Sequence, residues 1–470
     1  MPHDIPPGER RIVLVLASVA AFLTPFMGAS LNVAVPVIGR EFRMSAVSLG
    51  WIAMTYLLAA AVCLVPFGKI ADLTGRKRIF GWGSLLHAAS SLLAALAGST
   101  AVFFGARVLQ GIAGAMLIST GVAMLTSVYP PGERGRVLGL NVSFTYLGLS
   151  LGPVLGGAMT QHWGWRSIFL AASALGFILA LIVIGTLKGE EWTGGEKQAV
   201  DAAGALLMAG GLISLMLGFS RLPEPEGFLL LAAAAAFLVL FILREKRAPA
   251  PILDLNLFRG NRVFAFSNLA ALINYSATTA VGFVLSLHLQ IVKGLSPQAA
   301  GLVLLAQPAM MVLFSPLAGR LSDRIEPRFL ASSGMGIIAA GLLLLAGLNG
   351  ATSTAVIAGV LLVLGFGFAL FSSPNTNAVM GAVDKRSYGV ASALLGTMRI
   401  TGQMTSMGLA TLVFALRIGR VAISAEAHPG FLAASRIIFL ICAALCLAGV
   451  FASLARGKMH ETAGSLTSVD

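Results

Sequence analysis

The chain alternates between long apolar stretches and short polar intervals over almost its whole length. Each apolar stretch runs for about twenty residues, the length with which an α-helix crosses ~30 Å of hydrocarbon. Because backbone N–H and C=O groups in lipid must bond within the segment, these stretches are predicted to be membrane-spanning helices. The pattern predicts fourteen of them, at residues 12–34, 47–67, 79–98, 101–127, 137–159, 167–187, 201–220, 227–244, 263–287, 298–318, 330–349, 354–380, 388–416 and 431–455.

Two polar intervals, residues 188–200 and 245–262, are longer than the others and bracket a pair of helices. Without that pair, six helices remain on each side. The predicted fold is an all-α polytopic membrane protein. It consists of an N-terminal six-helix bundle, two additional transmembrane helices with their flanking loops, and a C-terminal six-helix bundle, at residues 1–187, 188–262 and 263–470.

A recurring loop supports an internal duplication of the six-helix unit. It follows the second helix of each half and reads GKIADLTGRKR at 68–78 and GRLSDRIEPR at 319–328. Two such halves related by an axis along the membrane normal are typical of a transporter whose substrate path lies between them.

The composition agrees with a membrane protein, because 57% of the residues are hydrophobic and only 11% are charged. The net charge of +13 would suggest a nucleic-acid partner in a soluble protein. Here most of the 32 Lys and Arg residues fall in alternate loops, which is the positive-inside pattern. The sequence therefore predicts an inner (plasma) membrane protein with both termini in the cytoplasm, and no nucleic-acid partner.

No catalytic constellation is visible in the sequence. There is no Walker loop, no Cys/His cluster with metal-ligand spacing and no nucleophile elbow. The protein is therefore not expected to be an enzyme, to bind a cofactor or a metal, or to use ATP for transport. Cys63, Cys442 and Cys446 lie in predicted helices, where apolar packing is the expected role.

The predicted helix over 137–159 contains an unusual number of helix-destabilising residues. Glycine costs a helix interior roughly 1 kcal/mol and proline about 3 kcal/mol relative to alanine. Gly148, Gly152 and Gly156 recur every four residues and form a flat stripe that lets another backbone approach, and Pro153 should kink the helix. The stripe is either a close-packed interface without further duty or a bendable seam between the halves that controls which side opens.

Three motifs resemble those of the major facilitator superfamily, in particular its fourteen-helix drug:proton antiporter branch. The 68–78 loop matches at Gly68, Asp72, Gly75, Arg76 and Lys77, and RVLQGIAGA matches at Arg107, Gln110, Gly111 and Gly114. The glycine-rich helix matches the antiporter motif at Gly139, Gly148, Gly152, Pro153, Gly156 and Gly157.

The resemblance implies a secondary active transporter that exports small amphiphilic compounds against protons by alternating access (multidrug efflux). An exporter or facilitator of one neutral or anionic metabolite is the alternative within transport. A non-transporting membrane receptor or scaffold is the alternative from another class. Expected partners are the substrate, protons and the lipid bilayer, and the chain is expected to be a monomer.

Several charged positions are candidates for gating and coupling. A carboxylate such as Asp72 can face the positive N-terminal end of a helix. The resemblance implies that this is the helix starting near Tyr388, where Ser387 is a plausible cap, and that the contact locks one side. Arg107 lies inside a span, where a charge marks function unless the side chain snorkels to the interface. Arg399, with Gln403 on the same helix face, is the counterpart in the second half.

None of the 19 acidic residues falls in the middle of a predicted span. Related antiporters carry an Asp five residues before the Asn of the first helix, but here that position is Met27, before Asn32. Arginines without an embedded acid predict a preference for neutral, zwitterionic or anionic amphiphiles over cations. His87, Asp72 and Asp201 are the remaining candidates for proton binding.

Polar and aromatic residues on the expected pathway helices are candidates for substrate contact. Each of them could instead form an interhelical hydrogen bond, worth about 0.6 kcal/mol on average. They are Asn32, Tyr146, Asn268, Asn274, Tyr275, Gln307, Asn375, Asn377 and Gln403.

Overall fold

The computed structural model describes residues 6–187, 201–248, 258, 260–322, 324–383, 388–421 and 428–457, which are helical with short connections and contain no strand. The first half consists of α1 (Pro7–Glu41), α2 (Ala46–Thr74), α3 (Arg76–Ala95), α4 (Thr100–Val128), α5 (Pro131–Trp163) and α6 (Arg166–Thr186). The additional pair is α7 (Ala202–Arg221) and α8 (Pro225–Glu245). The second half consists of α9 (Arg262–Leu287), its π-helical extension η2 (His288–Val292), α10 (Pro297–Leu304), α11 (Ala306–Ser322), α12 (Pro327–Ala346), α13 (Thr354–Gly381), α14 (Tyr388–Arg417) and α15 (His428–Ala455).

The helices correspond to the fourteen predicted spans, and the predicted fold class is confirmed. Helix α9 and η2 form one span, and α10 and α11 form another that is interrupted near Leu305. Twelve spans are recognisable from length and hydropathy alone. The others, α3 and α14, carry more polar residues, including Arg399 and Gln403 in α14.

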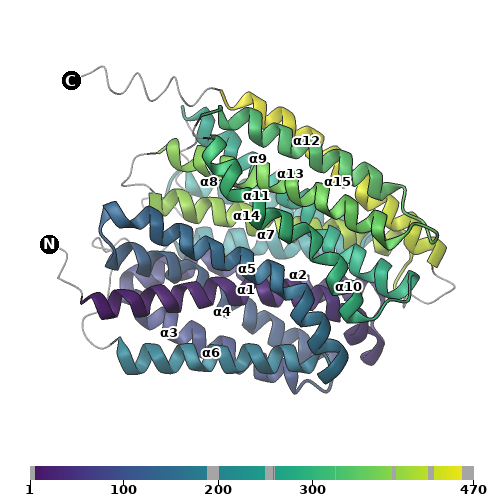
Figure 1. Cartoon of the computed structure of the whole chain (residues 1–470), viewed down its shortest axis with the longest axis horizontal. Coiled ribbons are helices and arrows are strands. Elements are labelled where there is room, and N and C mark those ends of the chain that lie inside the picture. Colours follow the sequence, from purple (N-terminus) through teal and green to yellow (C-terminus); the bar gives the residue numbers. More distant parts are fainter. Residues whose placement is uncertain are drawn as a thin grey trace.

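Equivalent helices of the two halves make corresponding contacts with the opposite half. Figure 1 shows the purple-to-blue first half below the green-to-yellow second half. The second span of the first half, α2, packs on α14, the fifth span of the second half. Reciprocally, α5 packs on α10 and α11, the second span of the other half. This reciprocity agrees with the predicted duplication, while the domain boundaries stay a prediction because 188–200 and most of 249–259 lie outside the described residues.

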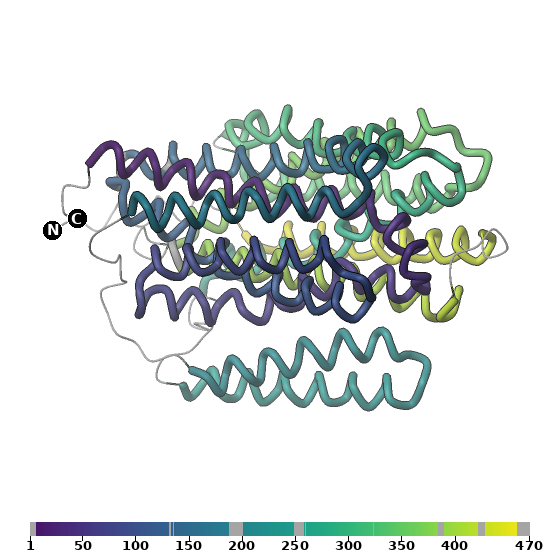
Figure 2. The backbone as a smooth tube through the Cα atoms, turned by 90° about the horizontal axis from the view of Figure 1, so that it is seen from below, coloured from purple at the N-terminus to yellow at the C-terminus, as the bar shows by residue number. Residues whose placement is uncertain are grey.

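The helices α7 and α8 form a hairpin beside the two halves, drawn in teal at the bottom of Figure 2. Glycines of α7 receive side chains of α8, as where Gly218 meets Leu231. Helix α7 contacts both α2 and α14, and Gly408 of α14 meets Met216 and Phe219. The hairpin therefore covers the line along which α2 of one half meets α14 of the other.

The glycine stripe of α5 faces α1 of its own half. A Cβ added at Gly152 would lie 2.6 Å from the Cβ of Ala29, and one at Gly156 would lie 2.5 Å from the Cβ of Ser30. The Ser30 hydroxyl donates to the carbonyl of Gly152 at 2.9 Å. The prediction that this stripe lies between the halves is wrong, because a small-residue stripe reveals a close approach but not the partner helix.

The neighbouring face of α5 does meet the second half. A Cβ added at Gly157 would lie 2.6 Å from the carbonyl oxygen of Pro297, and one added at Gly301 would overlap the carbonyl oxygen of Pro153. Backbones thus touch directly between α5 and α10. The contact between halves therefore uses Pro153 and Gly157, while Gly148, Gly152 and Gly156 hold α5 on α1.

Two alanine substitutions in the same motif test this assignment. We expect Gly152→Ala to lower the free energy of unfolding by about 1–3 kcal/mol, because the methyl group overlaps α1. Nothing lies within 4 Å of a Cβ at Gly139, so Gly139→Ala should stabilise α5 by up to about 1 kcal/mol. Unfolding of the purified protein in detergent, followed by circular dichroism, measures both, and equal shifts would contradict the assignment.

Candidate functional site

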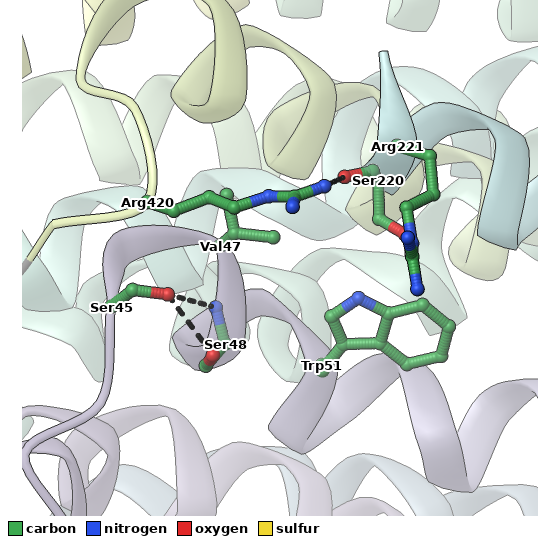
Figure 3. A pocket seen from close by; sticks show the side chains of 7 residues that line it. All are labelled: Ser45, Val47, Ser48, Trp51, Ser220, Arg221 and Arg420. Carbon is green, nitrogen blue, oxygen red and sulfur yellow. Dashed lines mark hydrogen bonds between the residues drawn. The ribbon is translucent and has the colours of Figure 1, made fainter. Parts of the chain in front are cut away.

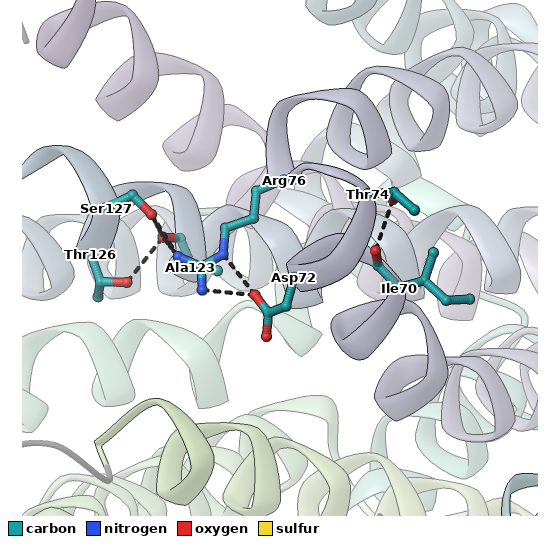
Figure 4. Close-up of polar contacts among 7 residues, drawn as sticks. All are labelled: Ile70, Asp72, Thr74, Arg76, Ala123, Thr126 and Ser127. Carbon is teal, nitrogen blue, oxygen red and sulfur yellow. Dashed lines mark hydrogen bonds and ion pairs between the residues drawn. The ribbon is translucent and has the colours of Figure 1, made fainter. Parts of the chain in front are cut away.

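The loop motif forms a polar clasp between α2, α3 and α4. Arg76 donates through Nε to Asp72 at 2.8 Å and through Nη1 to Ser127 at 2.6 Å and to the carbonyl of Ala123 at 3.2 Å, as Figure 4 shows. Gly75 has a φ of 115°, a conformation that favours glycine and lets α3 start directly after α2. Asp72 and Arg76 therefore fasten the turn to α4.

The predicted lock between Asp72 and α14 stays a prediction. Among the described residues, the partner of Asp72 is Arg76, and Ser387 lies outside them. Elsewhere the motif touches its own half: a Cβ at Gly68 would lie 3.7 Å from the Cβ of Ser119, and Lys77 lies 3.7 Å from Glu9.

Arg107 is buried in the first half, with 3% of its surface exposed, so it does not snorkel. It donates through Nε to the carbonyl of Ile52 at 3.1 Å and through Nη1 to Gln110 at 2.6 Å. Gln110 in turn donates to Ser91 at 2.7 Å. The guanidinium carbon lies 4.8 Å from the ring centroid of Tyr56, within cation–π range.

The two glycines of the same motif explain why Tyr56 can reach this position. A Cβ at Gly111 would overlap the carbonyl oxygen of Tyr56, and one at Gly114 would overlap its hydroxyl. Sequence reasoning missed Tyr56, although the glycines one and two turns after Arg107 signalled that a neighbouring helix comes close. Arg107, Gln110 and Gly111 thus form one arrangement that binds α2 to α4.

The candidate proton-binding residues have different surroundings. His87 of α3 is 1% exposed, and neither ring nitrogen has a hydrogen-bond partner in the described part of the chain. Asp201 accepts hydrogen bonds from Arg244 at 3.0–3.3 Å. The Arg244 side chain holds the pKa of this carboxyl below its usual range, so Asp201 is ionised at neutral pH. Met27 is 3% exposed in the core of the first half.

A second polar group lies where α5, α9, α13 and α14 meet. Arg399 donates through Nη2 to the hydroxyl of Thr376 at 2.8 Å, and its guanidinium carbon lies 5.8 Å from the ring centroid of Tyr275. The hydroxyls of Tyr146 and Ser372 lie 3.2 Å apart, so this group contains a hydrogen bond between the halves. We call these five residues the Arg399 cluster.

Of the other predicted contact residues, some lie at the interface between the two halves and some lie inside the second half. Asn32 lies at this interface, because a Cβ at Gly282 of α9 would be 3.4 Å from its amide nitrogen. Gln403 is half-buried one turn after Arg399, and Gln307 is half-buried where α11 packs on α13. Asn268 and Asn274 are fully buried, and Asn377 donates to Ser322 at 2.6 Å.

Asn375 belongs to an internal network and not to a substrate path. It is 2% exposed, donates to the carbonyl of Ser267 at 3.1 Å and accepts from Arg456 at 3.1 Å. Arg456, only 1% exposed, also donates to Ser267, Ser453 and the carbonyl of Pro327 at 2.8–3.1 Å. Burial lowers its pKa to about 10, which leaves it charged.

Sequence reasoning missed Arg456, because a basic residue after the last span fits the positive-inside pattern without any further role. In the structure it joins the ends of α9, α12, α13 and α15. This cluster of ends fixes the second half as a unit.

Direct contacts between the halves gather at one end of the bundle, opposite to the start of α1 and the end of α15. We call this the distal end. Gln290 donates to the carbonyl of Val33 at 2.8 Å, and the backbone N–H of Ala46 donates to Val421 at 2.9 Å. His162 lies 3.1 Å from Gln298, beside the Gly157–Pro297 contact.

A small pocket of about 190 Å³ also lies at the distal end, lined by Ser45, Val47, Ser48, Trp51, Ser220, Arg221 and Arg420 (Figure 3). Arg420 lies 3.0 Å from Glu224, and Arg221 lies 2.7 Å from Glu226. Drug-sized sites have volumes of roughly 300–1,000 Å³. The pocket is therefore smaller than a drug-sized site, and its arginines are paired with glutamates. Its lining comes from α2, α7 and the residues after α14, so it lies where the hairpin meets the two halves.

Two related helical halves, closed against each other at one end, define a membrane transporter. The sequence model of the Major Facilitator Superfamily matches residues 17–407, and the chain belongs to this superfamily. It is a transporter and not an enzyme, as predicted.

Similar proteins are transporters and exporters. The cephamycin export protein CmcT of Amycolatopsis lactamdurans is 30% identical over 94% of this chain and 93% of its own. The multidrug resistance protein Stp of Mycobacterium tuberculosis is 30% identical over 85% and 75%, and the riboflavin transporter RibZ of Clostridioides difficile is 28% identical over 83% and 85%. A solved peptide transporter, POT, has a TM-score of 0.67 over 94% of both chains at 15% identity, which shows the shared fold.

The Arg456 network generates a stability prediction. We expect Arg456→Ala to lower the free energy of unfolding by about 2–3 kcal/mol, because several buried acceptors lose a charged donor. Arg436→Ala is the control, since Arg436 lies exposed on the same helix. Thermal unfolding in detergent measures both, and a loss of similar size in the control would contradict the network's role.

Proposed function

We propose that the protein is a secondary active transporter of the inner membrane that exports small amphiphilic compounds by alternating access, coupled to protons, with both termini in the cytoplasm. The observation that carries the proposal is the closure of the two halves at the distal end, through α5–α10, α1–η2 and the start of α2. With cytoplasmic termini, this closed end faces outward.

Export is favoured by the relatives whose names describe export or multidrug resistance. The substrate preference is argued from charge. Arg107 and Arg399 lie within spans, while the family's acidic position is the buried Met27. A buried carboxylate would attract cations and bind protons, so its replacement by methionine favours neutral, zwitterionic or anionic substrates.

A dedicated exporter of one neutral or anionic metabolite is the second candidate. The similarity to the riboflavin transporter RibZ favours it. The two candidates differ in breadth: a multidrug exporter moves several unrelated compounds, whereas a dedicated exporter moves one and is inhibited by its close analogues.

Proteoliposomes with an imposed pH gradient test the proposal. We expect neutral and anionic amphiphiles to move against the proton flux, organic cations to move poorly, and Arg107→Ala to abolish the response to the gradient. A strong preference for monovalent organic cations would contradict the charge argument, and transport that ignores the gradient would contradict the coupling.

A pair of substitutions at one position isolates the missing acid. Met27→Asp should raise the rate of organic-cation transport severalfold, because it restores an ionisable group in the first half. Asparagine is nearly the same size and polarity as aspartic acid but cannot ionise, so Met27→Asn should leave cation transport unchanged. Equal behaviour of the two variants would show that charge at this position does not set selectivity.

A further inference from the structure

Arg107 and Arg399 differ in how their N–H groups are used. Arg107 is buried, with its Nε and Nη1 bonded to Ile52 and Gln110 and its face on Tyr56. Arg399 is only partly buried, and its Nε has no acceptor in the described part of the chain although that atom is shielded from solvent. Leaving a charged donor without an acceptor is costly, so Arg399 is suited to an acceptor supplied by a ligand.

The edge of the Arg399 guanidinium offers two donors. Nε and Nη2 lie on the same edge of the fork, and Nη2 carries two hydrogens, of which Thr376 accepts one. A carboxylate has two oxygens that match this edge, which is the pairing that distinguishes arginine from lysine. No carboxylate of the described residues forms an ion pair with Arg399.

Aromatic surface adjoins the cation. The Tyr275 ring lies under Arg399 and meets the edge of Phe368, with ring centroids 5.5 Å apart. Gly402 fixes this arrangement, because a Cβ there would lie 2.9 Å from the Cβ of Tyr275. Tyr146, Tyr275, Thr376 and Arg399 are all partly exposed, so a ligand between the halves can reach them.

The depth and the partners of the cluster suit a transported ligand. Arg399 is eleven residues from the start of α14, roughly 16 Å along the helix axis and thus near the middle of ~30 Å of hydrocarbon. Tyr146 comes from the first half and bonds to Ser372 of the second. A ligand held here would contact both halves, as alternating access requires.

We propose that the Arg399 cluster (Tyr146, Tyr275, Ser372, Thr376 and Arg399) binds the carboxylate of an aromatic organic anion, with the carboxylate on Arg399 and the ring beside Tyr275. The inference rests on the proposed transport function and narrows its substrate class. Arg107 has no part in this site, because it lies inside the first half, where its Nε and Nη1 donate to Ile52 and Gln110.

The test compares aromatic carboxylates of one to three rings with their isosteric carboxamides, using the full-length protein in nanodiscs. In the wild type we expect the carboxylates to bind more tightly than the amides. Arg399→Gln should weaken carboxylate binding at least tenfold and leave amide binding within about twofold. Arg436→Gln, an exposed arginine on α15, is the matched control and should change neither.

A second variant keeps the site testable if Arg399→Gln folds poorly. Tyr275→Leu removes the ring but no charge, so it should weaken carboxylates and amides alike. Wild-type protein that binds carboxylates no better than amides, or an Arg399→Gln variant that loses both equally, would overturn the site. Gradient-driven transport of the neutral compounds in proteoliposomes would then still support the proposed function, whereas no transport of any compound would reject the function itself.

Discussion

Direct backbone contact between helices is the constraint on which this structure depends. In lipid the hydrophobic effect does not press helices together, so close approach has to come from small residues. Helix α5 uses two faces for this purpose. One carries Gly148, Gly152 and Gly156 against α1, and the other presents Pro153 and Gly157 to α10 of the opposite half. The helix is thereby fixed in its own half while still touching the other.

The second constraint is the treatment of buried charge. Buried cations are tolerated where their N–H groups have acceptors, as for Arg107 and for Arg456. Glycines serve this purpose too, because Gly111 and Gly114 admit Tyr56 beside Arg107, and Gly402 admits Tyr275 beside Arg399. Each half thus places an arginine over a tyrosine, but among the described residues only the arginine of the first half has an acceptor for its Nε.

The helices and the motifs could be predicted from the sequence, because span length and residue spacing are local properties. It could not reveal which helix the α5 stripe meets, since Ser30 and Ala29 carry no signal of that contact. Arg456 was equally hidden, because its partners come from four separate helix ends. Only tertiary packing decides that Asn32 lies at the interface between the halves while Asn375 lies inside the second half.

The central claim is that the two halves are closed against each other at the distal end in this conformation and separate there during alternating access. Spin-label distances in nanodiscs test it most directly, with one label pair at the distal end (Trp163 and Ala351) and another at the opposite end (Leu140 and Arg324). The account predicts reciprocal changes when a transported compound or a pH gradient is applied: the distal distance lengthens as the other shortens. Distances that stay fixed, or that lengthen together, would contradict it.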